Sequence, residues 1–525
     1  MEQSGVEQSG VDGPGVKNPG IDDGIDTWVT RRAARQPDAV ALVDGVTGER
    51  FTYRELEARV SARASTLVGE GVRPGDRVAL LGENSTAYLE WLFAVARTGA
   101  VAVPLNTRLS PDEVAYMIGD SGSRVLVHSP ALSALAEGAL ERPTPVERVL
   151  GLAGPPGAPG EPEDLPLHGA RGSTPCAIIY TSGTTGRPKG AILTHDNMFW
   201  NAVNLVTAGK GLSRDDVTVA AAPLFHIGAL GLSALPVLYA GGTVVVVPAF
   251  DPVALVDLMA REAVTTQFLV PAMWAALARY GDLEHHPLPA LRWGLVGGAP
   301  CPLTVIEHFR DLGYVLCEGF GMTELSPAAL FLDASEIATH AGSVGRPFLN
   351  VDARLVDADG SLAQVGAIGE LELRGPTVFA GYWGNPQETA AAMHDGWFRS
   401  GDLGVADAEG FVTLVDRRKD MIITGGENVY PIEVEQVMHR HPSILEVAVI
   451  GVSDPTWGES VVAVAVTEGA VDPDEVVAWT RERIAHYKAP RRLELVDELP
   501  RNATGKILKR VLRERQAGTA ASVSR

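Results

Sequence analysis

The chain has 525 residues, of which 46% are hydrophobic and 21% charged, an ordinary composition for a globular protein. One hydrophobic core seldom serves a chain of this length, so we expect two or more domains. The formal net charge of -21 argues against nucleic acid as a main partner, because lysine and arginine bind phosphate backbones. It also disfavours adsorption to anionic membranes, but it does not exclude ATP or coenzyme A, whose sites depend on local cations.

The three cysteines, Cys176, Cys301 and Cys317, are scattered and form no CxxC pair, so neither a disulfide framework nor a zinc site is predicted. The sequence contains no secretory signal pattern and no run of about 18 to 20 apolar residues, so we expect no transmembrane segment. These features favour a cytoplasmic protein. They do not reveal its oligomeric state.

The first segment, residues 1–24, contains the sequence EQSGV twice and then a spacer rich in Gly and Pro. Too few of these residues are apolar to offset the entropy of ordering, so a disordered tail is predicted. Folded sequence is expected from residue 25, and Thr52 with Glu55 three positions later predicts a capping box at the start of a helix.

Alternating strands and helices follow. Residues 77–81 and 101–103 predict strands on either side of a helix at 85–98, and Ser110 with Pro111 predicts the start of another helix. The alternation of strands and helices continues further along the chain, with strands predicted at 243–247, 267–270 and 291–296 and a helix at 251–262. The pattern predicts an α/β fold of mainly parallel sheets layered with helices.

A Pro- and Gly-rich connection at residues 151–174 interrupts a large domain that we place at 25–416. Beyond it the pattern changes to a small α+β domain at 421–515, followed by a tail at 516–525. The elements predicted there are helices at 432–441 and 473–484 and strands at 447–452, 461–466 and 492–496.

Residues 178–195 read IIYTSGTTGRPKGAILTH, a short apolar run that enters a loop of glycines, hydroxyls and one lysine. Glycine frees the backbone, hydroxyls donate hydrogen bonds, and Lys189 adds a compact positive charge, which together suit a polyphosphate. An ordinary surface turn is the alternative. A Walker A loop is disfavoured because Gly190, not Ser or Thr, follows the lysine.

Residues 319–324 read GFGMTE, in which Phe320 could stack on a purine, Thr323 could meet a phosphate and Glu324 could hold Mg²⁺. The alternative is a turn that ends in a core aromatic and a surface glutamate. Residues 297–300, GGAP, follow a predicted strand and would let a base approach the backbone closely.

Other candidates are weaker alone. Asp402 in SGDL could accept two hydrogen bonds from ribose hydroxyls, or could form an Asx turn. Lys506 in NATGK is by default an exposed lysine, and His226 in PLFHI is by default a buried histidine. The cluster at 416–420, DRRKD, is by default a solvated face.

These motifs share one order over residues 25–515, and this order resembles the adenylate-forming superfamily of acyl-CoA synthetases, 4-coumarate-CoA ligases, adenylation domains and luciferases. The strings KDMIITGGENVYPIEVE and LPRNATGKILKR are closest to bacterial fatty-acyl-CoA synthetases. Phe320 departs from the family's commoner tyrosine. The resemblance implies a mobile small domain that turns on a hinge at 417–420, centred on Lys419.

The resemblance also implies roles for individual residues. Catalysis is assigned to Thr185, Lys189, Glu324 and Lys506, with Glu324 as the Mg²⁺ ligand. Acyl binding is assigned to His226, Gly228, Gly298 and Gly321, and the approach of coenzyme A to Gly425 and Gly426. ATP and AMP binding is assigned to Thr181, Ser182, Gly183, Thr184, Thr185, Gly186, Lys189, Gly297, Gly298, Ala299, Pro300, Gly319, Phe320, Gly321, Met322, Thr323, Asp402 and Arg417.

The expected activity is formation of an acyl-adenylate from a carboxylic acid and ATP, followed by transfer of the acyl group to coenzyme A. A different acceptor, such as an amine or a carrier-protein thiol, or an unusual acid such as nitrite, is the alternative. The absence of a fused carrier domain favours free coenzyme A. Small residues around the expected pocket leave room for a fatty chain or an aromatic ring; these residues are Gly228, Ala229, Gly231, Ala328 and Ala329. No arginine or lysine is evident there to pair with a second carboxylate.

Overall fold

The computed structural model describes residues 24–154, 172–181, 187–280, 282–283, 285–454, 456–502 and 505–523. Most of the predicted N-terminal tail, the centre of the Pro- and Gly-rich connection and residues 182–186 of the phosphate loop lie outside the described residues.

The elements predicted from local signals are present. The Thr52 side chain accepts from the Glu55 amide and the Glu55 carboxylate accepts from the Thr52 amide at 2.7 Å, which confirms the capping box of α2 (Tyr53–Gly69). The strand expected at 77–81 is β3 (Arg77–Leu81), and the helix expected at 85–98 is α3 (Thr86–Arg97). Each of these elements is predicted from residues that lie close together in the chain, and tertiary packing does not override such local signals here.

Parallel neighbours predominate in the seven-stranded and four-stranded sheets of the large region and make up half of the pairings in the five-stranded sheet, which confirms the expected α/β fold class. The seven-stranded sheet runs β18 (Gly381–Tyr382), β8 (Lys189–Thr194), β7 (Pro175–Thr181), β4 (Val101–Pro104), β3, β5 (Val125–His128), β6 (Arg148–Gly151). The five-stranded sheet runs β11 (Thr266–Leu269), β12 (Trp293–Val296), β13 (Leu316–Gly321), β14 (Ala328–Phe331), β15 (Arg346–Pro347). The four-stranded sheet runs β2 (Arg50–Thr52), β1 (Val40–Asp44), β10 (Thr243–Val246), β9 (Val217–Ala220).

The expectation of mainly parallel sheets does not extend to residues 352–417, where the neighbours pair antiparallel. The reason is connection length, because a parallel crossover needs about a dozen residues. Here β20 turns into β21 within five residues, 407–411, and Gly410 takes a φ of 86°. The strands are β16 (Asp352–Val356), β17 (Ile368–Arg374), β19 (Met393–His394), β20 (Trp397–Ala406) and β21 (Val412–Arg417).

Helices cover these sheets and carry much of the apolar core. In the large region they are α1 (Asp26–Arg35), α2, α3, α4 (Pro111–Ser121), α5 (Ser133–Leu140), α6 (His195–Thr207), α7 (Ile227–Ala229), α8 (Leu235–Ala240), α9 (Pro252–Arg261), α10 (Pro271–Tyr280), α11 (Leu303–Asp311), α12 (Ile337–His340) and α13 (Pro386–Ala392), with shorter helical turns η1 (Pro130–Leu132), η2 (Leu230–Ala234) and η3 (Thr323–Leu325).

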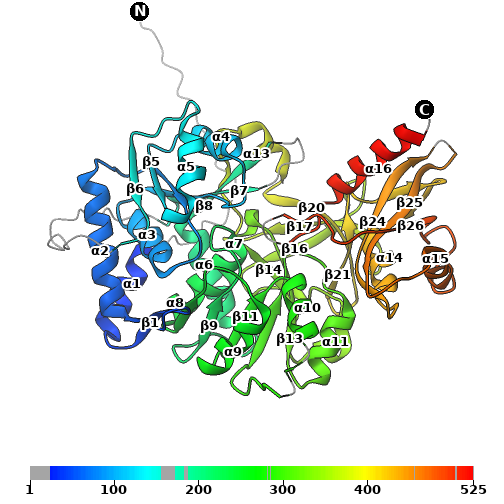
Figure 1. The fold of residues 1–525 in the computed structure, drawn as a ribbon, viewed down its shortest axis with the longest axis horizontal. Helices are drawn as coiled ribbons and strands as arrows, with labels where there is room; N and C mark the ends of the chain where they lie inside the picture. The colour runs from blue at the N-terminus through cyan, green and yellow to red at the C-terminus, as the bar shows by residue number, and fades with distance from the viewer. Residues whose placement is uncertain are drawn as a thin grey trace, which may run out of the picture.

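The C-terminal region has a sheet and apolar clusters of its own, and Figure 1 shows it, in orange to red, at one end of the molecule's long axis. Helix α16 continues beyond residue 515, where the sequence predicts a tail. The elements are β22 (Ile422–Thr424), β23 (Glu427–Val429), α14 (Pro431–Met438), β24 (Ile444–Asp454), β25 (Gly458–Thr467), α15 (Pro473–Arg481), β26 (Arg492–Leu495) and α16 (Lys509–Val523).

Across the described part of the chain, no helix combines the length and apolar character needed to cross a membrane.

Candidate functional site

The flanks of the phosphate loop form a hairpin. Strand β7 ends at Thr181 and β8 begins at Lys189, and these two residues are partners in the antiparallel register. The Lys189 ammonium lies 2.6 Å from a Glu388 carboxylate oxygen of α13 and 5.5 Å from the centre of the Tyr382 ring. The predicted residues Ser182, Gly183, Thr184, Thr185 and Gly186 lie outside the described residues.

Glu324, in η3, is buried, and the Tyr382 hydroxyl donates to its Oε1 at 2.9 Å. Removal from water raises the pKa of Glu324, while the tyrosine hydrogen bond lowers it. A buried carboxylate oxygen is a hard donor that fits Mg²⁺, which usually takes one or two protein carboxylates and completes its shell with phosphates and water. Among the described residues no cluster of three or more His, Cys, Asp or Glu side chains could hold a metal alone.

The segments expected to bind adenine meet at one edge of a sheet. Residues 297–300 follow β12, residues 319–321 end β13, and the two strands pair in parallel. A side chain at Gly321 would collide with the Pro327 carbonyl, so only glycine fits there. Phe320 packs in the main apolar core with 9% of its surface exposed, and its stacking on a purine stays a prediction.

Asp402 and Arg417 are register partners on β20 and β21. The Arg417 Nε lies 3.1 Å from Asp402 Oδ1, while the buried Oδ2 has no hydrogen-bond partner among the described residues. Burial raises the pKa of Asp402, and the charges of Arg417 and Lys506 lower it. A buried acceptor oxygen of this kind suits a ribose hydroxyl, because leaving it unpaired is costly.

Lys506 reaches this cluster from the C-terminal region. Its amide donates to Asn502 Oδ1 at 2.9 Å, and the Asn502 amide donates to the Lys506 carbonyl at 2.9 Å, which closes the turn that presents the lysine. The pKa of Lys506 is lowered to about 8, mainly by removal from water and next by the charge of Arg417, while Asp402 acts in the opposite sense. The structure therefore brings the charge of Lys506 close to Arg417, Lys419 and Asp402, which lie about 90 to 100 positions earlier in the sequence.

His226 begins α7, and its Nδ1 accepts a hydrogen bond from the Gly228 amide at 3.1 Å. Burial, and to a lesser degree the charge of Lys506, lowers the pKa of His226 to about 4, so the ring is neutral at pH 7 with its proton on Nε2. A Cβ at Gly228 would lie 3.3 Å from this ring and 3.3 Å from the Phe268 ring. Gly228 is therefore packed closely between two flat rings, and a side chain there would press on both.

The expectation that Gly231 leaves room for the acyl group is wrong. A Cβ there would lie 2.5 Å from Pro327 Cδ, so the proline already fills that space. Ala328 and Ala329 are likewise buried within the main core.

The residues expected on the coenzyme A side lie in the turn between β22 and β23. Gly425 and Gly426 are exposed and have φ values of 60° and 85°. The Gly425 amide donates to the Trp457 carbonyl at 2.8 Å, a contact within the C-terminal region. Lys419 lies two residues after the end of β21, and burial lowers its pKa.

Sequence reasoning missed Tyr382, Glu388 and Phe268, which touch or flank the predicted residues Glu324, Lys189 and Gly228. No local pattern marks them, because their contacts join segments far apart in the chain.

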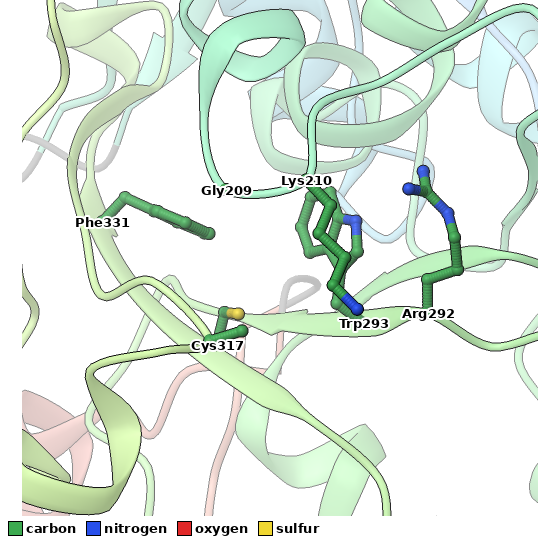
Figure 2. A pocket seen from close by; sticks show the side chains of 7 residues that line it. Gly209, Lys210, Arg292, Trp293, Cys317 and Phe331 are labelled. Carbon is green, nitrogen blue, oxygen red and sulfur yellow. The ribbon is translucent and has the colours of Figure 1, made fainter.

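A separate small cavity lies at the other end of β12 and β13, where Figure 2 shows Trp293, Cys317 and Phe331 beneath the turn at Gly209 and Lys210. Its volume is about 10 Å³, the space of about one water molecule, so it cannot hold an acyl group.

Comparison with known proteins agrees with this geometry. The family model described as AMP-binding enzyme matches residues 29–383, and the model described as AMP-binding enzyme C-terminal domain matches residues 433–506. Feruloyl-CoA synthase of Amycolatopsis sp is 45% identical over 500 residues, covering 94% of this chain and 99% of that protein. Indoleacetate–CoA ligase of Aromatoleum aromaticum is 38% identical, covering 93% and 98%. ATP-bound MatB from Rhodopseudomonas palustris is 34% identical with a TM-score of 0.85, covering 93% and 98%.

Proposed function

The chain belongs to the AMP-binding enzyme family, and we propose that this AMP-forming acyl-CoA synthetase activates a planar aromatic acid, an arylalkenoic or arylacetic acid. The relatives named above are a feruloyl-CoA synthase and an indoleacetate–CoA ligase, which supports an aromatic acid. The observation that carries the proposal is the pair of rings, His226 and Phe268, that lie against Gly228 in the segment assigned to the acyl group.

A planar aromatic acid bound beside these residues gains contact with their rings. Aromatic rings prefer stacked or edge-on contacts with other rings, which add about 0.5 to 1.5 kcal/mol beyond simple burial. The neutral His226 carries its proton on Nε2, and an N–H at this position can donate to the carboxylate of the acid without adding a buried charge.

The first half-reaction joins the acid to the α-phosphate of ATP and releases pyrophosphate. Negative charge concentrates at the α-phosphate as the carboxylate attacks, and cations held in place beforehand lower that barrier. We assign this role to Lys506, with Lys189 and the loop from Thr181 to Gly186 holding the outer phosphates. Lys189 must exchange its contact with Glu388 for a phosphate oxygen.

We propose that Mg²⁺ is held by Glu324, oriented by the Tyr382 hydroxyl. When bound, the ion neutralises phosphate charge. Asp402 and Arg417 would hold the ribose, and the segments 297–300 and 319–323 would enclose adenine.

In the second half-reaction the thiol of coenzyme A attacks the acyl-adenylate and AMP leaves. A different group must then face the adenylate, so we propose that the C-terminal region rotates about Lys419 and presents the glycines Gly425 and Gly426. Their lack of side chains suits a slender pantetheine arm. ATP and coenzyme A are substrates of cytoplasmic metabolism, and we propose that compartment for the enzyme.

The testing experiment measures acid-dependent pyrophosphate release across hydroxycinnamic, arylacetic, benzoic and fatty acids, with and without coenzyme A, and identifies the products by mass. The proposal expects an aromatic acid to have the highest kcat/KM and to yield its CoA thioester in equal amount to pyrophosphate. A fatty acid preferred over every aromatic acid would refute the substrate class. Pyrophosphate release without any thioester would identify another acceptor.

A further inference from the structure

The C-terminal region docks on the large region through contacts that do not include Lys506. One contact is made by Gln436 on α14. Its side-chain amide donates to the Cys301 carbonyl at 2.9 Å, and its amide oxygen accepts from the Leu303 backbone at 3.2 Å. Gln436 therefore binds the backbone immediately after residues 297–300, the segment assigned to adenine.

A second contact lies between β24 and α10. Arg279 of α10 donates to the Leu445 carbonyl at 3.2 Å, and its guanidinium lies 3.8 Å from Glu446 Oε1. The other oxygen of Glu446 lies 2.9 Å from the Arg501 guanidinium. Glu446 thus bridges an arginine of the large region and an arginine of the C-terminal region.

Arg501 also holds the turn that presents Lys506. Its NH1 donates to the Gly505 carbonyl at 2.6 Å, and Gly505 lies against the start of α10, where an added Cβ would be 3.3 Å from Val270. The connection from Arg279 through Glu446 and Arg501 to Gly505 ends one residue before the catalytic lysine. The Glu446 carboxylate therefore takes part both in docking the C-terminal region on α10 and in orienting the turn that carries Lys506.

We propose that Glu446 is a positioning residue for adenylation, which couples docking of the C-terminal region on α10 to the placement of Lys506, with Gln436 as a second docking contact. The proposal rests on the role assigned to Lys506 under the proposed function. Glu446 pairs with Arg279 and Arg501 and is not among the residues assigned to a substrate, so its loss is expected to act through the population of the docked state and the geometry of the turn.

The test compares the two half-reactions in the full-length enzyme. Pyrophosphate release in the presence of acid and ATP reports adenylation, and thioester formation from supplied acyl-adenylate and coenzyme A reports the second step. The variants are Glu446→Gln, Gln436→Ala and the double variant, with Glu446→Asp as the conservative variant. Glu514→Gln is the matched control, because Glu514 pairs with Arg510 within α16.

Partly exposed ion pairs are weak, so Glu446→Gln is expected to slow adenylation about threefold to tenfold, and the double variant further. Thioester formation is expected to stay within about twofold, Glu446→Asp to recover part of the loss, and Glu514→Gln to behave as wild type. Equal losses in both half-reactions, or a double variant no slower in adenylation than Glu514→Gln, would overturn the inference.

If Glu446→Gln lowers the folded yield, Arg279→Gln removes the same bridge from the other side and carries the same expectation. Lys506→Ala separates this inference from the proposed function. If Lys506→Ala leaves adenylation intact, the assigned role of the lysine fails; if it abolishes adenylation while the Glu446 variants do not slow it, only the positioning role fails.

Discussion

The lowered pKa of Lys506 makes a direct prediction about the pH dependence of adenylation. The ammonium form is the one that offsets charge at the α-phosphate, so the step requires a protonated Lys506. Burial and the charge of Arg417 lower its pKa to about 8, from the 10.5 of an ordinary lysine. Adenylation should therefore decline in a pH range where an ordinary lysine is still fully charged.

The size of the decline follows from the pKa. A group with a pKa of about 8 is about 90% protonated at pH 7 and about 10% protonated at pH 9. The value applies to the free enzyme, so the matching kinetic constant is kcat/KM and not kcat. We expect kcat/KM for adenylation to fall about tenfold between pH 7 and pH 9.

The assay is pyrophosphate release at limiting ATP over pH 6.5 to 9.5, in the absence of coenzyme A. Lys506→Arg gives the comparison, because a guanidinium remains charged throughout this range. That variant is expected to be slower but to lose the decline near pH 8. Lys506→Ala should lose adenylation by orders of magnitude while using supplied acyl-adenylate nearly as well as wild type. A flat wild-type profile up to pH 9.5, or the same decline in Lys506→Arg, would refute this reasoning.

Further substitutions test the other assignments. Asp402→Ala should raise the KM for ATP about 10- to 100-fold, the cost of about one or two charged hydrogen bonds, and unchanged binding of AMP by calorimetry would exclude a ribose contact. Gly228→Val should displace the rings of His226 and Phe268 and lower kcat/KM for aromatic acids at least tenfold more than for acetate, whereas an equal loss for both would exclude contact between the acid and these rings. Glu324→Gln should raise the Mg²⁺ concentration that gives half-maximal adenylation, with an unshifted titration as the contrary result. Lys419→Pro should preserve adenylation and stop thioester formation, and normal coenzyme A turnover would contradict the hinge assignment.

Much of the fold was predictable because its signals are local. The capping box of Thr52 and Glu55, and Ser110 followed by Pro111, mark helix starts within four residues, and the structure has both. The antiparallel sheet at 352–417 was missed because strand direction depends on turn length, which the alternation of apolar residues does not reveal.

The site was predictable in a different way. Physical reasoning from Asp402 or Lys506 alone favoured an Asx turn and an exposed lysine, and only the order of motifs pointed to a shared site. The structure places charges of Lys506, Arg417 and Asp402 within mutual influence. Glu446 and Gln436 carried no signal at all, since their partners Arg279 and Cys301 lie more than a hundred positions away.

The charges at the docked site also suggest what drives the enzyme from one half-reaction to the next. Burial is the main cause of the lowered pKa of Lys506; Arg417 and Lys419 lower it further, and Asp402 and Asp420 act in the opposite sense. Burying the charged Lys506 at this cluster is therefore unfavourable until an anion is present. ATP supplies that anion, so it should favour the docked state, and the coupling must be reciprocal: docking should tighten ATP binding. When pyrophosphate leaves, most of the negative charge leaves with it, so the cost of burying the charged lysine should then favour the proposed release of the C-terminal region.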